Sequence, residues 1–192
     1  MNLIPTGVDT TKFFPGIYVH ERQRLGWNED APVVLFNAGH DPKGKRLDLA
    51  CEVIALARKS LPFLKFIVLR GEVAPDDVPR LMRAADCLLF TSDYEGSPTV
   101  IQEAMACNLP IVSVPAGDVP ERLANISYCS LVPRDKVQLA RAVVRILHDR
   151  PRTNGYEIAI AEVGNDSITR MVEKVYEDAT KNRRRDRLAQ TK

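Results

Sequence analysis

Short, uninterrupted apolar runs alternate along this chain with longer segments in which apolar residues recur at helical spacing. The apolar runs lie at 33–37, 65–69, 87–91 and 111–114, and a fifth, weaker run lies near 128–132. Runs that are apolar throughout are typical of strands covered on both faces of a parallel sheet. Because helical segments separate the runs, the connections are expected to be crossovers. The pattern therefore predicts an α/β fold, a doubly wound parallel sheet with helices on both faces.

The helices are predicted from periodicity and from residues that begin or end them. Gly26 closes a short helix that begins near residue 17. Asn108-Leu109-Pro110 ends another, because the residue before a proline avoids helical angles. The segment 153–192 carries apolar residues between Met171 and Tyr176 on one helical face, so one or two helices are expected to pack back on the domain. The other predicted helices are 47–59, 77–85 and 135–148, with a short one after the PAGDVPE turn.

One domain of ordinary size accounts for most of the 192 residues. Residues 1–15 are turn-rich and are interpreted as an extended lead-in, residues 16–180 as the α/β domain, and residues 181–192 as a basic, polar tail. The tail, KNRRRDRLAQTK, fits peripheral contact with an anionic membrane or a partner, and it also fits a solvated helix end.

Composition and charge argue against nucleic-acid binding, a membrane span and a metal site. A net charge of +2 does not indicate a nucleic-acid surface, and no apolar run approaches the length of a membrane span. No signal peptide is recognised, so a cytoplasmic location is expected, at the inner face of the membrane if the tail contacts lipid. The four cysteines stand singly in apolar segments, as buried reduced thiols do, and the three histidines are widely separated. No metal site is therefore predicted.

The stretch from Asp93 to Pro110, DYEGSPTVIQEAMACNLP, holds the candidate chemistry. Two of the apolar runs flank it, so a loop and a helix are expected between two strands. Ser97 is a suitable N-cap and Pro98 a suitable first helical residue. The free backbone N–H groups at such a helix N-terminus favour the binding of a phosphate.

Two carboxylates flank this helix N-terminus, Glu95 in the loop and Glu103 in the helix. A carboxylate accepts hydrogen bonds from adjacent hydroxyls, which a ribose or a hexose offers. The residues therefore fit a ligand that carries both phosphate and sugar. From the spacing alone, a turn-capping Glu95 and a solvated Glu103 are the simpler interpretation.

The loops that follow parallel strands share the carboxyl edge of the sheet, where folds of this kind bind ligands. The loop 39–45 contributes Gly39, which allows close backbone approach, and it is basic, with Lys43, Lys45 and the following Arg46. Such a loop opposite a helix N-terminus fits a phosphate site, and it also fits a solvated loop.

Taken together, these segments resemble the nucleotide-sugar-binding C-terminal domain of GT-B glycosyltransferases, specifically the retaining family 4. The resemblance covers nearly all of residues 3–150, through PTGVDTTKFFP, the G-x5-K of 39–45, AADCLLFTSDYEGSPTVIQEAMACNLPIVS and AGDVPE. The E-x7-E spacing of Glu95 and Glu103 inside that longer match is specific, and it favours the sugar-nucleotide interpretation. The resemblance implies the Rossmann-like half of a GT-B fold and identifies residues 1–15 as the remnant of an interdomain linker.

The resemblance also implies a role for each matching position. Glu103 would accept hydrogen bonds from ribose hydroxyls, Glu95 would meet the transferred sugar, and Lys45 would balance the charge of the departing diphosphate. Glu95 and Lys45 are the implied catalytic residues, the implied substrate is a nucleoside-diphosphate sugar, and neither a metal nor another cofactor is implied. The implied donor-binding residues are Gly39, His40, Lys45, Gly71, Glu72, Val73, Glu95, Gly96, Ser97, Pro98, Thr99, Val100 and Glu103.

Two departures from the family pattern bear on activity. His40 stands where the family usually has an arginine, and histidine is a weaker phosphate clamp, which Lys43 or Arg46 is expected to supplement. The chain also begins in what resembles the linker, so the acceptor-binding N-terminal domain is an expected partner. Alone, the chain is expected to bind nucleoside diphosphate but to transfer sugar poorly or not at all.

Two other functions fit the same residues. One is a non-catalytic nucleotide-sugar-binding module, and the other is a GT-B sugar-nucleotide epimerase. A dinucleotide oxidoreductase is disfavoured, because no GxGxxG follows the first predicted strand.

Overall fold

The computed structural model describes residues 4–190, with side chains described as far as Lys181. Its strands form one all-parallel sheet in the spatial order β2-β1-β3-β4-β5. The prediction of a parallel α/β sheet is confirmed. The strands are β1 (Val33–Asn37), β2 (Lys65–Leu69), β3 (Cys87–Phe90), β4 (Ile111–Ser113) and β5 (Ser130–Leu131).

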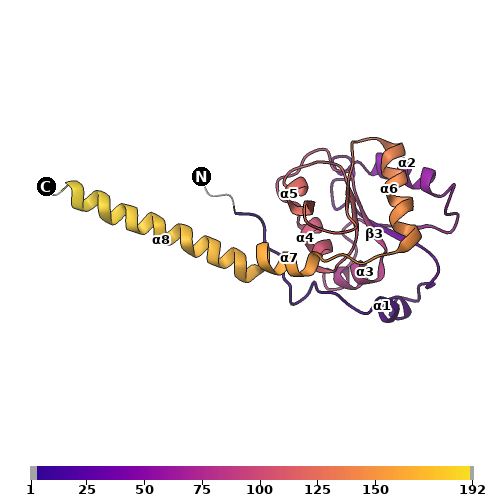
Figure 1. The fold of residues 1–192 in the computed structure, drawn as a ribbon, viewed down its shortest axis with the longest axis horizontal. Helices are drawn as coiled ribbons and strands as arrows, with labels where there is room; N and C mark the ends of the chain where they lie inside the picture. The colour runs from indigo at the N-terminus through magenta and orange to yellow at the C-terminus, as the bar shows by residue number, and fades with distance from the viewer. Residues whose placement is uncertain (1–3, 191–192) are drawn as a thin grey trace.

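Helices cover both faces of this sheet (Figure 1). Neighbouring strand residues point to opposite faces, so Val34 packs under α2 and α6, whereas Leu35 packs under α3, α4, α5 and α7. This is why the central strands β1 and β3 are apolar along almost their whole length. The helices are α1 (Tyr18–Arg24), α2 (Leu47–Ala57), α3 (Val78–Ala84), α4 (Thr99–Ala106), α5 (Val119–Leu123), α6 (Lys136–Asp149), α7 (Gly155–Glu162) and α8 (Asn165–Gln190).

The central strands β1 and β3 lie side by side, and the chain leaves them in opposite directions. Helix α2 carries the chain from β1 to the outer strand β2, whereas α4 carries it from β3 toward β4 on the other side. The loops after β1 and β3 therefore diverge at the carboxyl edge of the sheet. In open α/β sheets, ligands bind in the crevice that such divergence creates.

A buried ion pair fixes α1 to the opposite, amino-terminal edge of the sheet. Arg22 Nη2 lies 2.6 Å from Asp86 Oδ2, and the two side chains are 0% and 1% exposed. Arg22 also donates to the carbonyl oxygen of Ala84, and Asp86 accepts from the Val33 N–H and the Tyr18 hydroxyl. Each buried charge thus has several partners, as burial of a charge requires.

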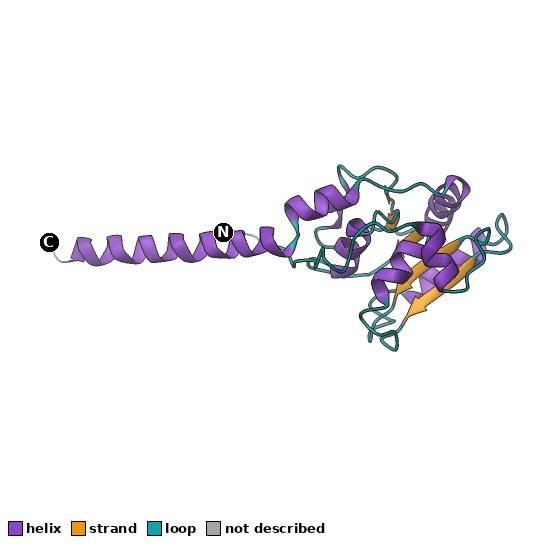
Figure 2. Cartoon of the chain, turned by 90° about the horizontal axis from the view of Figure 1, so that it is seen from below, coloured by secondary structure: helices purple, strands orange, loops and turns teal. Residues whose placement is uncertain are grey.

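Helix α8 contradicts the expectation that the C-terminal part packs back on the domain. Figures 1 and 2 show α8 extending away from the body, while α7 lies against it. The apolar face was too sparse to hold α8 down, and Tyr176 on it is 70% exposed. Residues 181–190 of the predicted tail continue α8, and residues 191–192 lie outside the described residues. None of the described helices, α8 included, combines the length and the apolar character that a membrane span requires.

The four cysteines are free thiols. Cys87 and Cys107 are buried, and burial raises the pKa of the Cys107 thiol to about 12. Cys51, however, is exposed on α2, so the expectation of burial is wrong for that residue.

Candidate functional site

A cleft of about 570 Å³ opens at the carboxyl edge of the sheet. Its walls come from the loops after β1 and β2 and from the first turns of α4. The fold therefore brings together residues that are widely spaced in the sequence. Six of the predicted donor-binding residues line the cleft: Gly39, His40, Gly71, Val73, Thr99 and Glu103.

The lead-in forms a further wall, which sequence reasoning missed. Asp9, Lys12 and Phe13 line the cleft, so this segment is more than a connection. Lys12 Nζ lies 2.9 Å from Asp76 Oδ1 in the loop after β2, and this ion pair joins two walls of the cleft. The PTGVDTTKFFP segment is the only sequence signal for this wall, and by itself it indicates a linker.

Glu103 presents an uncompensated carboxyl group to the cleft. Burial raises its pKa to about 7, and no neighbouring charge or hydrogen bond opposes that effect. A ligand that donates hydrogen bonds to this carboxyl group would favour its charged form and lower the pKa again. Glu103 is therefore suited to a ligand with hydroxyl donors.

The two residues implied as catalytic, Lys45 and Glu95, form an ion pair between the loops after β1 and β3. Their side chains are 29% and 14% exposed, so the pair is largely shielded from solvent. Neither residue lines the cleft that holds Glu103. The structure thus places the predicted residues in two groups at the same edge of the sheet, one in the cleft and one at the Lys45–Glu95 pair.

Helix α4 begins one residue later than predicted. Pro98 is its N-cap, Thr99 is its first helical residue, and no side chain caps it. Ser97 instead donates from Oγ to Asp118 Oδ2 at 2.8 Å, and its carbonyl oxygen accepts from the Thr6 hydroxyl at 2.7 Å. The prediction that Ser97 caps the helix is therefore wrong. The N–H groups of the first turn have no side-chain acceptor, which leaves them open to an anion.

Several predicted donor-binding residues lie outside the cleft. Val100 packs in the core, so only its backbone can meet a ligand. Gly96 lies against the loop after β4, where a Cβ added to Gly117 would stand 2.2 Å from the Gly96 carbonyl oxygen. Gly117 has φ +56°, which favours glycine at this close approach. The residues outside the cleft, besides Lys45 and Glu95, are Glu72, Gly96, Ser97, Pro98 and Val100.

In the basic loop after β1, Arg46 is not free to supplement His40 at a phosphate, because it is already paired. The ring of His40 packs over Gly71, where an added Cβ would stand 2.7 Å from His40 Cε1. Arg46, expected as one of two possible supplements to His40, already donates to Asp93. Lys43 is exposed in the same loop, and it does not line the cleft.

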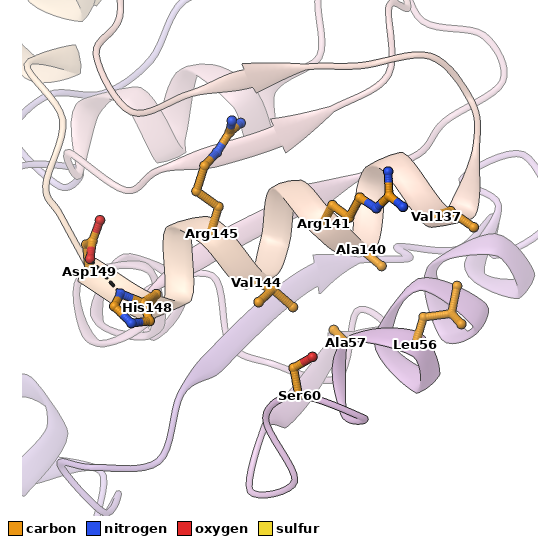
Figure 3. A pocket seen from close by; sticks show the side chains of 10 residues that line it. All are labelled: Leu56, Ala57, Ser60, Val137, Ala140, Arg141, Val144, Arg145, His148 and Asp149. Atoms are coloured by element: carbon orange, nitrogen blue, oxygen red, sulfur yellow. Dashed lines mark hydrogen bonds and ion pairs between the residues drawn. The ribbon is translucent and has the colours of Figure 1, made fainter.

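A second groove, of about 480 Å³, lies between α2 and α6 (Figure 3). Leu56 and Ala57 of α2 face Ala140 and Val144 of α6 across it, so its floor is apolar. The groove shares no residue with the cleft and contains none of the predicted site residues.

In the part of the chain that the structure describes, no group of His, Cys, Asp or Glu residues could hold a metal ion. The carboxyl edge is therefore the candidate site.

Known proteins share this sequence pattern. The family model described as "Glycosyl transferases group 1" matches residues 27–149. The 2-deoxystreptamine N-acetyl-D-glucosaminyltransferase of Streptomyces fradiae is 27% identical over 163 residues, which cover 81% of this chain and 37% of that protein. The chain spans between 21% and 42% of the length of the curated relatives it matches.

Solved structures share the fold. The sucrose-phosphate synthase of Thermosynechococcus elongatus superposes with a TM-score of 0.76 at 23% identity, over 94% of this chain and 53% of that one. HepE of Anabaena, in complex with UDP and glucose, superposes with a TM-score of 0.68 at 20% identity, over 93% of this chain and 56% of that one. The fold is that of a GT-B glycosyltransferase domain, and the family match shows that this chain belongs to the group 1 glycosyl transferases.

Proposed function

We propose that this chain is the donor-binding half of a glycosyltransferase that uses a nucleoside-diphosphate sugar, retains the anomeric configuration and needs no metal. One observation carries the proposal: the uncapped N-terminus of α4, the Glu103 carboxyl group and the Lys45–Glu95 pair meet at one edge of the sheet. N–H groups and a cation suit a diphosphate, and carboxylates suit vicinal hydroxyls. The presence of UDP and glucose in HepE, which has a similar fold, supports the same ligand class here.

The proposal gives each end of the donor its own set of contacts. The nucleobase lies between Gly71 and Val73, and the ribose hydroxyls donate to Glu103, all of which line the cleft. The diphosphate then runs past the N-terminus of α4 toward Lys45. The sugar follows it and meets Glu95.

Lys45 and Glu95 act separately once the donor is bound. In the free chain each neutralises the other's charge. With donor present, the Lys45 ammonium turns to the diphosphate, whose negative charge grows as the bond to the sugar breaks. Glu95 then accepts hydrogen bonds from the sugar hydroxyls. A cation that interacts more strongly with the departing group than with the intact donor lowers the barrier.

The acceptor binds on a second domain in this proposal. The chain covers 53% and 56% of the two glycosyltransferase-fold chains compared above, so much of each lies beyond the region it matches. A reaction between two domains needs both, and the isolated chain is proposed to bind donor without efficient transfer. Sugar transfer measured with an acceptor-binding half supplied, and without it, tests that part of the proposal.

Isothermal titration calorimetry with UDP, GDP and ADP tests donor binding itself. We expect one of the three to bind, and Glu103→Ala to weaken it about ten- to a hundredfold, the usual effect of losing hydrogen bonds to a charged group. Glu157→Ala, at an exposed position on α7, is the matched control and should leave the affinity unchanged. If none of the three nucleotides binds, or if Glu103→Ala binds as tightly as the wild type, the proposal is wrong.

A further inference from the structure

We propose that Arg134 is a positioning residue, which holds the loops that carry Lys45 and Glu95 in their relative places by acting through Asp93. The inference rests on the proposed function of that pair. Arg134 lies between β5 and α6, distant in sequence from both loops, and it does not line the cleft.

Arg134 fixes the chain where it leaves β3. Its guanidinium donates from Nη1 to the carbonyl oxygen of Thr91, and from Nη2 to that of Ser92 at 2.8 Å. Thr91 and Ser92 are 0% and 1% exposed. Nη1 also lies 3.1 Å from Asp93 Oδ1. One planar guanidinium thus holds three consecutive residues that lead to Glu95, which a lysine ammonium is poorly shaped to do.

Asp93 connects the same segment to the loop after β1. Its N–H donates to the carbonyl oxygen of Gly44 at 2.9 Å, and its Oδ1 lies 3.3 Å from Arg46 Nη1. Close by, the Thr91 hydroxyl donates to the carbonyl oxygen of Lys45 at 2.8 Å. The backbone before and at Lys45 is therefore tied to the segment that leaves β3.

The same contacts maintain an unusual backbone conformation next to Lys45. Arg46 has φ +58°, a left-handed conformation that a residue other than glycine adopts only where its surroundings hold it. Asp93 stands between the guanidinium groups of Arg46 and Arg134. Without Arg134, Asp93 would keep only its ion pair with Arg46, and Arg46 is also paired with Asp48. We therefore expect both loops to shift when Arg134 is removed.

A small shift matters because Lys45 and Glu95 must act on the same ligand. A misplacement of about 1 Å at a reacting centre can cost about a hundredfold in rate. No described contact of Arg134 is with the Lys45 or Glu95 side chain itself. Its effect is therefore exerted through the two loops.

The first test needs no ligand. Arg134→Gln removes the guanidinium, Arg134→Lys keeps the charge without its planar fork, and Arg141→Gln at an exposed position of α6 is the matched control. We expect the backbone amide NMR resonances of residues 44–46 and 95 to shift in both Arg134 variants and to stay in place in the control. Resonances that do not move in Arg134→Gln would overturn the proposal, whatever the chain binds.

The second test separates positioning from a general loss of structure. The wild type and the variants are titrated with a nucleoside diphosphate and with the corresponding nucleoside. We expect Arg134→Gln to weaken the diphosphate about five- to twentyfold and the nucleoside less than twofold, because Gly71 and Glu103 lie outside the two loops. Arg134→Lys should recover only part of the loss. Equal losses for both ligands would overturn the proposal. A wild type that binds no nucleoside diphosphate would instead refute the proposed function, and the role of Arg134 in it, even if the resonances shift.

Discussion

The raised pKa of Glu103 makes the stability of the fold depend on pH. Burial raises this pKa from 4.5 to about 7 in the folded chain, and unfolding restores the ordinary value. Between these two values the unfolded chain loses the proton while the folded chain keeps it, so the free energy of unfolding falls as the pH rises. At about 1.4 kcal/mol for each pH unit between the two pKa values, the loss amounts to about 3 kcal/mol and is complete above the folded pKa.

Glu103→Gln removes this titration without a large change in side-chain volume. We expect the variant and the wild type to differ by less than about 1 kcal/mol in urea denaturation at pH 5, and the variant to be about 3 kcal/mol more stable at pH 8.5. Glu157→Gln, at an exposed position, should show no such pH dependence. A stability difference for Glu103→Gln that is the same at both pH values would refute the reasoning.

The same proton reports on the proposed ligand. Ribose hydroxyls donate to the charged carboxylate, so nucleotide binding should lower the pKa of Glu103 and release about half a proton at pH 7. Calorimetry in two buffers of different ionisation enthalpy measures this release. Binding without proton release would show that the ligand makes no such contact with Glu103.

Three further perturbations test other parts of the structure. Arg22→Met should lower the free energy of unfolding by about 3–5 kcal/mol, because it leaves a buried carboxylate without its cation. Urea denaturation should show a change below about 0.5 kcal/mol for Arg24→Met on the exposed side of the same helix, and similar losses in both variants would contradict this account. Gly117→Ala should cost about 1–3 kcal/mol, because its φ is positive and the new Cβ would meet a backbone oxygen. Thermal melts should show a smaller loss for Gly26→Ala, which has φ +63° but open space around it; a smaller loss at Gly117 would rule out the clash. Lys12→Ala should leave the melting temperature within about 2 °C, since its ion pair is exposed, yet weaken nucleotide binding at least about twofold in calorimetry; unchanged affinity would exclude a contact between Lys12 and the ligand.

The sheet was predictable because its signal is local. The strands at Val33–Asn37 and Lys65–Leu69 have the predicted bounds, because a short apolar run can be recognised as a strand from its own residues alone. The cleft was predictable for a related reason: loops after parallel strands must share one edge. That rule places Gly39 and Gly71 at one edge of the sheet without any side-chain detail.

The features that could not be predicted depend on contacts between distant residues. Ser97 fits an N-cap by its local sequence, but Asp118 offers its hydroxyl an acceptor outside the helix. Arginine side chains usually lie at the surface, so the sequence alone does not predict that Arg22 is buried. Its burial is explained by the ion pair with Asp86, which is distant in sequence. Arg134 carries no local motif, because its partners are the backbone oxygens of another loop. Periodicity correctly placed a helix at α8 but gave no information about what its apolar face would meet.

The segment from Thr6 to Phe13 touches the site at two places, through the Ser97 carbonyl group near the proposed sugar end and through the cleft wall near the proposed base end. Equilibrium linkage is reciprocal, so if an occupied site favours one position of this segment, restraining the segment must change affinity by the same factor. A mechanical force on this segment from outside the domain would therefore change the affinity for the nucleotide. Nucleotide binding would in turn change the force that the segment exerts on whatever is attached to it.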